Sequence, residues 1–307
     1  VITSNNLRKH IFTKKKYSLM PFLTNKTSDE VTDIFYEDYG KGQPVILIHG
    51  WPLSHRAWEH QVSDIVNAGY RCITYDRRGF GLSSFPWSGY DYSTLASDLN
   101  EMIKKLKLKK CVLVGFSMGG GEVVRYLTDY GDKKIDKAVL ISSIIPLVMK
   151  KKGNPKGVPE KALNGILKAL KTDRVGFLKK FHKGFYNYKS RSKSNKVSEA
   201  QLEYDWSIAA YAAPHATIEA AKAWATTDFR PELKNVKVPT LIIHGDADQT
   251  VPIETAGDQA AKGIKNNQYV VFKDAPHGLN VTHAEKLNKT LIQFLNEGVT
   301  SSRKRSI

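Results

Sequence analysis

Residues 112–121 read Val-Leu-Val-Gly-Phe-Ser-Met-Gly-Gly-Gly, and this stretch decides which fold the chain adopts. A short apolar run leads directly into Gly-x-Ser-x-Gly, and a helix-like run then continues to Tyr130. This order predicts a strand that turns sharply into a helix, with Ser117 at the apex of the turn. Gly115 and Gly119 fit the turn because side chains there would collide as the strand and the helix close on each other. Ser117 is therefore a candidate nucleophile.

The motif needs support from its surroundings, because 22 glycines in 307 residues produce it by chance in about one such chain in ten. Short apolar runs predict strands, and apolar residues at helical spacing predict helices between them. The expected strands are 31–36, 45–49, 71–75, 111–114, 138–142, 240–244 and 269–272, and the expected helices are 56–68, 92–106, 120–130, 253–264 and 282–295. This alternation predicts an α/β fold, with a mostly parallel central sheet flanked by helices.

The alternation stops between Pro146 and Arg230, where the sequence shows only helical patterns and two loops, 153–159 and 190–197. A helical insertion that follows a sheet strand predicts a cap over the carboxyl edge of the sheet. The expected organisation is a core formed by residues 20–145 and 231–297, with a helical cap at 146–230.

Both ends of the chain are basic. Residues 1–19 hold five Lys/Arg and no acidic residue, and residues 298–307 hold three Lys/Arg and no acidic residue. Residues 1–19 are either a targeting or tag remnant, or upstream sequence translated ahead of a start at Met20, and we favour the second interpretation. We expect residues 1–19 to form a poorly ordered tail and residues 298–307 a second basic tail.

The composition is ordinary for a soluble globular protein, with 41% hydrophobic and 25% charged residues. No run approaches the ~18 apolar residues of a membrane helix, so no spanning segment is predicted. Cys72 and Cys111 lie in apolar strand-like runs and are expected to be buried, reduced thiols. These features favour a cytoplasmic protein that does not bind a membrane.

The formal net charge is +17, and residues 150–196 contribute fifteen Lys/Arg against two acidic residues. A basic stripe of this kind can mark a nucleic-acid-binding surface. We favour a solvated helical surface instead, because no nucleic-acid-binding motif accompanies the charge. No nucleic-acid partner is therefore expected.

A serine hydroxyl becomes an effective nucleophile when an adjacent base takes its proton and an acid orients that base. On a fold of this kind the acid and then the histidine follow the serine, each on a loop after a late strand. Asp246 and Asp248 follow the expected strand 240–244, and His277 follows the expected strand 269–272. We favour Asp248 as the acid, and we expect Asp246 to be a turn residue that accepts backbone N–H bonds.

His277 is one of nine histidines, and its position after a late strand makes it the preferred base. His283 starts a helical pattern and is expected on the surface. His49 and His244 close strands, where packing or a backbone hydrogen bond is the expected role. Four other histidines have no strand-end context: His55, His60, His182 and His215.

The oxyanion that forms when a serine attacks a carbonyl group needs two hydrogen-bond donors. The Met118 N–H is one candidate. The loop His49-Gly50-Trp51-Pro52 follows an early strand, so the Trp51 N–H is the second candidate, and the indole is expected to form an apolar wall. Phe116 and Thr250 adjoin catalytic positions in the sequence and are expected to line the substrate pocket. The cap supplies further aromatic candidates, which are Phe177, Phe181, Phe185, Tyr186 and Trp206.

These residues resemble the α/β-hydrolase superfamily, and in particular its group of cofactor-free bacterial haloperoxidases, or perhydrolases, and aryl esterases. The resemblance spans residues 20–297 and rests on six segments, His49–Ser54, Tyr75–Gly81, Gly115–Gly121, Thr227–Phe229, His244–Gln249 and Ala275–Gly278. It implies the α/β-hydrolase fold, a triad of Ser117, Asp248 and His277, oxyanion donors at Trp51 and Met118, and a homo-oligomer. It also implies an enzyme without haem or metal, in keeping with the absence of a Cys/His cluster and the scattered carboxylates in the sequence.

Pro52 bears on the activity that the resemblance implies. Members of this group that favour perhydrolysis tend to carry proline after the oxyanion tryptophan, whereas plain esterases vary there. Proline fixes its own φ and has no N–H, so it can aim the preceding carbonyl group into the site, where that group would accept a hydrogen bond from peroxide or peracid. The alternative is that Pro52 is only a good turn residue.

The sequence therefore predicts a serine hydrolase that acts on carboxylic esters through an acyl-enzyme, with perhydrolase activity when hydrogen peroxide replaces water. The expected substrate is a small ester or a short carboxylic acid, and no cofactor is expected. Two alternatives remain, a hydrolase of amide, lactone or C–C bonds on the same fold and a catalytically silent binding protein. Dehalogenation or epoxide opening would require an aspartate where Ser117 stands.

Overall fold

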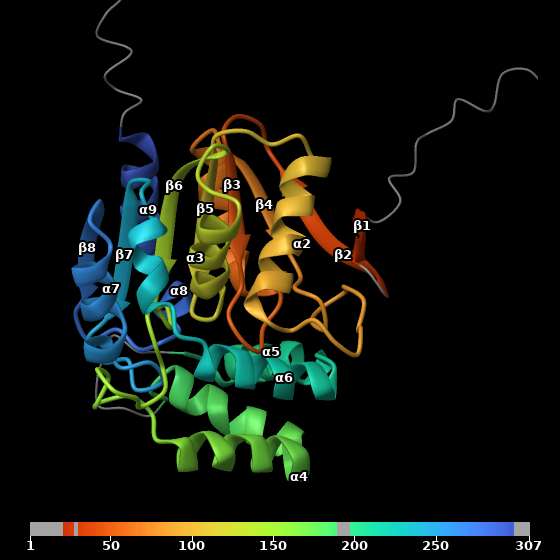
Figure 1. Ribbon diagram of the computed structural model, residues 1–307, viewed down its shortest axis with the longest axis vertical. Coiled ribbons are helices and arrows are strands. Elements are labelled where there is room, and N and C mark those ends of the chain that lie inside the picture. The colour runs from red at the N-terminus through yellow and green to blue at the C-terminus, as the bar shows by residue number, and fades with distance from the viewer. Residues whose placement is uncertain (1–20, 28–29, 189–196, 298–307) are drawn as a thin grey trace, which may run out of the picture.

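A computed structural model describes residues 21–27, 30–188 and 197–297 (Figure 1). The predicted tails 1–19 and 298–307, the proposed start at Met20 and nearly all of the predicted loop 190–197 lie outside the described residues.

An eight-stranded sheet forms the centre of the fold, with the strand order β1-β2-β4-β3-β5-β6-β7-β8. The strands are β1 Phe22–Thr27, β2 Glu30–Tyr39, β3 Pro44–Ile48, β4 Arg71–Tyr75, β5 Cys111–Phe116, β6 Ile135–Ile141, β7 Thr240–Gly245 and β8 Asn267–Phe272. Pairing is parallel from β4 through β8, and β2 pairs antiparallel with both β1 and β4. The predicted α/β fold with a mostly parallel sheet is therefore confirmed.

Residues 31–36 lie in a strand, as predicted, but the expectation that it is the first strand is wrong. β1 precedes them and pairs with β2, from Phe22 opposite Phe35 to Thr27 opposite Glu30. Its sequence, Phe-Leu-Thr-Asn-Lys-Thr, is largely polar and lacks the apolar run by which the other strands could be recognised.

Helices cover both faces of the sheet, because alternate strand residues point to opposite faces. Ile46 and Ile48 of β3 belong to one apolar cluster, which includes residues of α2 and α3. Val45 and Leu47 belong to a second cluster, which includes residues of α1 and α9. The helices are α1 Glu59–Asn67, α2 Tyr92–Lys105, α3 Gly119–Asp129, α4 Glu160–Phe185, α5 Glu199–Tyr211, α6 Pro214–Thr226, α7 Gly257–Gly263, α8 Leu279–Thr282 and α9 Ala284–Asn296.

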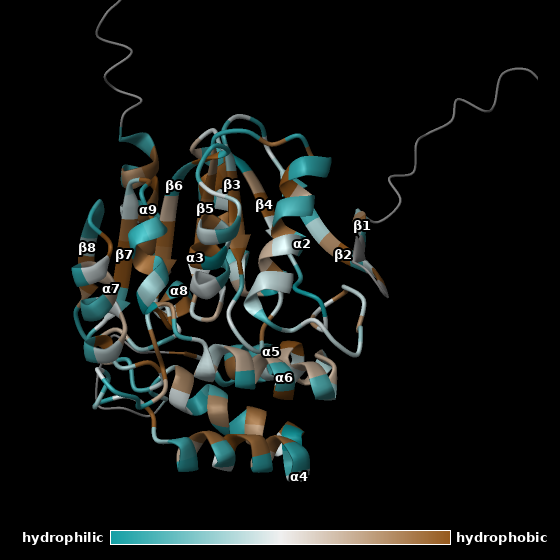
Figure 2. Cartoon of the chain, in the orientation of Figure 1, coloured by the Kyte–Doolittle hydropathy of each residue, from teal (hydrophilic) through white to brown (hydrophobic). Residues whose placement is uncertain are grey.

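The central strands are mainly hydrophobic, and the helices carry hydrophilic residues among hydrophobic ones (Figure 2). Three helices predicted as single are each divided in two. The predicted helix 56–68 begins with the 3₁₀ turn His55–Trp58, and the predicted helix 253–264 begins with the 3₁₀ turn Ile253–Thr255. The predicted helix 282–295 is divided by the break between α8 and α9.

The helical insertion consists of α4, α5 and α6, which lie together at one end of the sheet (Figure 1). This insertion was predicted and is confirmed, whereas its division from the core as a separate domain stays a prediction. Pro214 opens α6, where its missing N–H removes no helical hydrogen bond. α4 and α6 bring aromatic residues to the carboxyl edge of the sheet, described below.

The two cysteines are buried and free, as predicted. Burial raises the pKa of Cys72 and of Cys111 to about 12, which keeps both thiols protonated and unreactive. Within the described residues, no helix is long and apolar enough to cross a membrane.

Candidate active site

Ser117 lies at the sharp turn between β5 and α3, with a φ of +53°. A serine in this left-handed region is strained, and it persists because the surrounding structure fixes the turn. A Cβ at Gly115 would lie 2.5 Å from the carbonyl oxygen of Gly119, and a Cβ at Gly119 would collide with the carbonyl oxygen of Ile48. Glycine is therefore required at both positions, for the reason that the sequence predicted.

Ser117, Asp248 and His277 are brought together from three separate loops. His277 Nε2 lies 2.9 Å from Ser117 Oγ, and His277 Nδ1 lies 2.7 Å from Asp248 Oδ2. Because the carboxylate can only accept, Nδ1 carries the proton, and Nε2 is left to accept the serine hydroxyl proton. The rings of Phe116 and Phe185 pack against His277, with centroids 5.3 and 4.7 Å away.

Asp248 is held by its own loop. Its Oδ1 accepts the backbone N–H groups of Thr250 and Val251 at 2.9 and 2.7 Å. Burial alone would raise the pKa of Asp248, but the nearby charge and hydrogen bonds of His277 and His244 outweigh it and bring the pKa to about 2. The carboxylate is therefore ionised at neutral pH and aligned with His277.

The second candidate aspartate and three further histidines have contacts that define their roles. Asp246 is exposed, and its Oδ1 accepts the Asp274 N–H at 2.6 Å, so it is a turn residue as predicted. His49 and His244 bond backbone carbonyl groups, as predicted, at 2.8 and 2.9 Å. His283 is half-buried rather than on the open surface, because it packs near the ring of Phe272.

The two residues predicted to donate backbone N–H groups to an oxyanion, Trp51 and Met118, both line the hollow beside Ser117. Met118 precedes α3, and Trp51 lies in a turn closed by the hydrogen bond from Leu53 N to Gly50 O at 3.0 Å. Among the described residues, neither the Met118 nor the Trp51 N–H donates to another backbone group in the turns and loops. An oxyanion needs such unpaired donors, and the assignment of these two N–H groups to it stays a prediction.

A buried ion pair between Arg77 and Glu122 stabilises the loop that contains Trp51. The Arg77 guanidinium donates to the His49 carbonyl oxygen at 2.7 Å and to Glu122 Oε1 at 2.6 Å. The Arg77 N–H donates to His49 Nε2 at 3.0 Å, so His49 Nδ1 carries the proton given to Gly50 O. Burial holds the pKa of His49 well below its ordinary value, which keeps the ring neutral. Arg77 thus ties the loop to α3.

A small hollow of about 30 Å³ adjoins Ser117. Its walls are mainly apolar, and the indole of Trp51 packs between Phe181 of α4 and Trp224 of α6, with ring centroids 5.3 and 5.8 Å away. The lining residues are Trp51, Ser117, Met118, Ile144, Phe181, Trp224, Thr250, Val251 and His277.

A sequence profile of the family described as alpha/beta hydrolase fold matches residues 43–284. The chain belongs to this family. It is similar to a bromoperoxidase from Bacillus anthracis, a solved structure with 45% identity and a TM-score of 0.86, covering 90% of this chain and all of that one.

Relatives of known name place the chain within one group of α/β-hydrolases. A non-heme chloroperoxidase of Kitasatospora aureofaciens is 39% identical and covers 91% of this chain and 100% of its own length. A bifunctional esterase/perhydrolase of Acinetobacter calcoaceticus is 36% identical and covers 88% of this chain and 98% of its own length. The predicted enzyme class, the haloperoxidase, perhydrolase and esterase group of the α/β-hydrolases, is confirmed.

Of the three residues predicted to line the substrate pocket of this α/β-hydrolase, one lines the hollow and two do not. Thr250 lines the hollow, whereas Phe116 packs behind His277 and Pro52 is buried beside Trp51. The substrate role of these three residues stays a prediction.

Of the predicted cap aromatics, Phe181 lines the hollow and the others do not. Phe185 packs on His277, Phe177 on Phe181, Tyr186 bonds Asp205, and Trp206 bonds the Val175 carbonyl group. Ile144, Trp224 and Val251 also line the hollow and were not predicted from the sequence.

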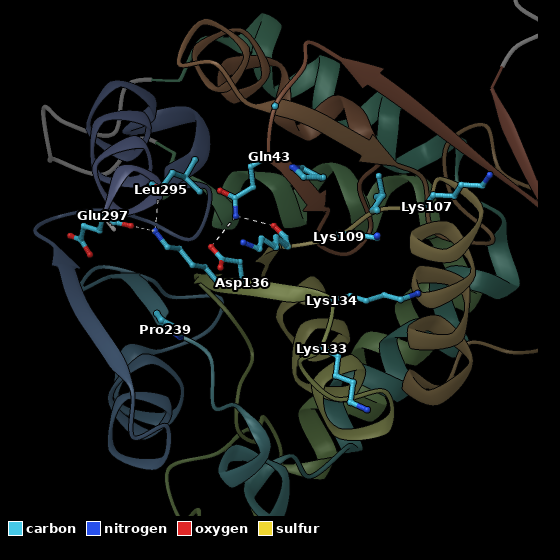
Figure 3. A pocket seen from close by; sticks show the side chains of 14 residues that line it. Gln43, Lys107, Lys109, Lys133, Lys134, Asp136, Pro239, Leu295 and Glu297 are labelled. Atoms are coloured by element: carbon cyan, nitrogen blue, oxygen red, sulfur yellow. Dashed lines mark hydrogen bonds between the residues drawn. The ribbon is translucent and has the colours of Figure 1, made fainter. Parts of the chain in front are cut away.

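A larger hollow, of about 1140 Å³, does not contain the triad of this α/β-hydrolase. It lies where β3, β5 and β6 begin, at the opposite edge of the sheet, and lysines dominate its rim (Figure 3). Gln43 bridges its centre by donating to Lys110 O and Asp136 Oδ2 at 2.8 and 2.9 Å. Size alone does not identify the active site, because Ser117 and His277 line the smaller of these two hollows.

Proposed function

We propose that the protein is a serine hydrolase that cleaves carboxylic esters through an acyl-enzyme on Ser117. One observation carries the proposal, which is the continuous contact from Ser117 Oγ through the His277 ring to the ionised Asp248 carboxylate. Such an alignment lets the base remove the serine proton while the acid stabilises the charged ring.

The first half of the reaction transfers the acyl group to Ser117. Ser117 Oγ attacks the ester carbonyl carbon while its proton moves to His277 Nε2. The carbonyl oxygen becomes an oxyanion, and the N–H groups of Trp51 and Met118 stabilise it. The C–O bond to the alcohol then breaks, and His277 returns its proton to the leaving alcohol.

The second half releases the acyl group. Water attacks the acyl-enzyme and gives its proton to His277, which passes it to Ser117 Oγ as the carboxylic acid leaves. We propose that hydrogen peroxide can replace water, so that a peracid leaves instead. A released peracid oxidises halide ions in solution, which would account for haloperoxidase activity without a redox cofactor. The bifunctional esterase/perhydrolase among the relatives supports this second reaction.

We propose that the acyl group is short. The hollow beside Ser117 has about 30 Å³, and Phe181 and Trp224 of the cap line it. A space of that size holds about two water-sized groups, which suits an acetyl group better than a longer chain.

The hydrolase proposal is tested with p-nitrophenyl acetate, using the native chain and Ser117→Ala. We expect Ser117→Ala to lower kcat at least about 10⁴-fold, and a fluorophosphonate probe to label only the native chain. An active and unlabelled Ser117→Ala variant would refute the proposal.

The perhydrolase reaction is tested separately, with acetate and hydrogen peroxide and the variant Pro52→Leu. If Pro52 aims the Trp51 carbonyl group at peroxide, the variant makes peracid about tenfold more slowly and keeps its esterase activity. Equal peracid formation in both proteins would remove the argument from Pro52.

We further propose a cytoplasmic location, which the two buried free thiols favour. A homo-oligomer, implied by the family resemblance, is tested by light scattering of the purified chain. A single-chain mass would reject it.

A further inference from the structure

His244 is a buried histidine that the proposed mechanism does not use. It lies at the end of β7, four residues before Asp248, and is 1% exposed. Its Nε2 lies 2.9 Å from the carbonyl oxygen of Val251 and 3.3 Å from Asp248 Oδ2. A second imidazole therefore contacts the acid of the triad.

The contact with Val251 fixes where the His244 proton sits. A carbonyl oxygen can only accept, so Nε2 carries the proton, which also faces the Asp248 carboxylate. Oδ2 of Asp248 then lies between two ring N–H groups, and Oδ1 accepts the backbone N–H groups of Thr250 and Val251. Three hydrogen bonds therefore orient this carboxylate, and the His244 Nε2–H lies 3.3 Å from Oδ2 as a fourth polar contact.

Packing holds the His244 ring in the same way. A Cβ at Gly257 would lie 2.9 Å from Cβ and 3.0 Å from Nδ1 of His244, so the start of α7 lies directly against the imidazole. Nδ1 has no hydrogen-bond partner among the described residues. The ring is thus oriented by close contact on one side and by Nε2–H on the other.

We propose that His244 is a positioning residue for the triad, which holds Asp248 Oδ2 in line with His277 Nδ1. This inference rests on the proposed function of Ser117, Asp248 and His277. No proton passes to or from His244 in the reaction, since the Ser117 proton goes only to His277 Nε2. His244 acts by orienting the Asp248 carboxylate. That orientation in turn sets how efficiently His277 accepts the Ser117 proton.

Two substitutions separate this role from packing. His244→Phe keeps a ring in the same space and removes the donor, whereas His244→Gln places an amide N–H near the position of Nε2. We expect His244→Phe to lower kcat about 10- to 100-fold with KM nearly unchanged, the size of effect seen when a partner that orients a functional carboxylate or histidine is removed from a metal site. We expect His244→Gln to restore most of the lost kcat.

The matched control is His55→Phe. His55 is a buried histidine outside the triad that contacts an aspartate, with Nδ1 2.8 Å from Asp76 Oδ1 and with its Nε2 lacking a hydrogen-bond partner among the described residues. This variant should keep its kcat within about twofold, because His55 does not touch the triad.

The test uses two measurements on the full-length chain. One is kcat with p-nitrophenyl acetate, and the other is the far-downfield proton NMR signal of His277 Nδ1–H, which needs no substrate. We expect His244→Phe to shift or broaden that signal, and His244→Gln and His55→Phe to preserve it. Thermal unfolding checks that each variant folds, and Gly257→Ala, which displaces the ring, replaces His244→Phe if that variant does not.

The proposal is overturned if folded His244→Phe keeps both the native signal and the native kcat. It is also overturned if His244→Gln and His244→Phe lose activity equally, because shape alone would then account for the effect. If the native chain cleaves no ester and its signal still responds as predicted, the proposed function fails and the positioning role stands.

Discussion

At the scale of single residues, the triad depends on one carboxylate that is kept charged in a buried place. Asp248 is 5% exposed and receives N–H donors on both oxygens, and its pKa is about 2. An aspartate in an unfolded chain titrates at a pKa of about 3.9. The folded state therefore favours the ionised form, so Asp248 stabilises the fold above that pKa.

This stabilisation is lost as pH falls from about 4 to about 2, where the folded protein takes up the proton. Between about pH 5 and about pH 3, the loss from Asp248 amounts to about 1 kcal/mol of the free energy of unfolding. We expect the free energy of unfolding of Asp248→Asn, measured in urea, to fall by about 1 kcal/mol less than that of the native chain between about pH 5 and about pH 3. Asp246→Asn, in the same loop but exposed, should match the native chain. An unchanged fall in Asp248→Asn would contradict the assigned charge.

At the scale of elements, we propose that the cap helices limit which acyl group reaches Ser117. Trp224 of α6 and Phe181 of α4 line the small hollow, with the Trp51 indole packed against both. We expect Trp224→Ala to admit longer chains, because a methylene group in an apolar pocket changes kcat/KM by roughly 10- to 200-fold. The ratio of kcat/KM for p-nitrophenyl butyrate to that for the acetate should rise at least about tenfold.

Trp206→Ala provides the control for Trp224→Ala. Its indole bonds the Val175 carbonyl group within the cap and does not line the hollow. This variant should keep the native preference for the acetate. A butyrate-to-acetate ratio that Trp224→Ala leaves unchanged would show that the cap does not set the acyl length.

The elements also show why sequence predicts some features and misses others. Ser117, Asp248 and His277 each follow a strand, and strand ends can be recognised from short apolar runs, so their order along the chain predicts that they meet. β1 was missed because its polar sequence becomes a strand only by pairing with β2.

Tertiary contacts explain the remaining omissions. Trp224 was missed because it lies 107 residues from Ser117, in a helix whose placement no local sequence pattern fixes. His244 was correctly expected to bond a backbone carbonyl group. Its second contact, with Asp248, depends on how the loop after β7 folds back.

At the scale of the whole molecule, the two edges of the sheet have separate roles. The carboxyl edge holds the triad, and the opposite edge ties the end of α9 to β6. Lys137 donates to the carbonyl oxygens of Phe294, Leu295 and Glu297 at 2.7, 3.0 and 2.7 Å. These groups belong to the helix end, where carbonyl groups lack partners within the helix.

We expect Lys137→Met to lower the free energy of unfolding by about 1–3 kcal/mol, because it leaves those carbonyl groups without their donor. Its kcat should stay native, since the change lies at the edge away from Ser117. Lys133→Met, an exposed lysine on the same rim, should leave stability within about 0.5 kcal/mol of the native value. Equal stability of the two variants would contradict the role assigned to Lys137.

The central claim is that Ser117 carries the acyl group during turnover. It is tested most directly by mixing the native chain with p-nitrophenyl acetate, quenching with acid within one turnover and mapping the added mass by peptide mass spectrometry. The mechanism predicts one acetyl group on the peptide that contains Ser117, and none in Ser117→Ala. Turnover without that acetyl group, or an acetyl group on another residue that turns over at the steady-state rate, would contradict it.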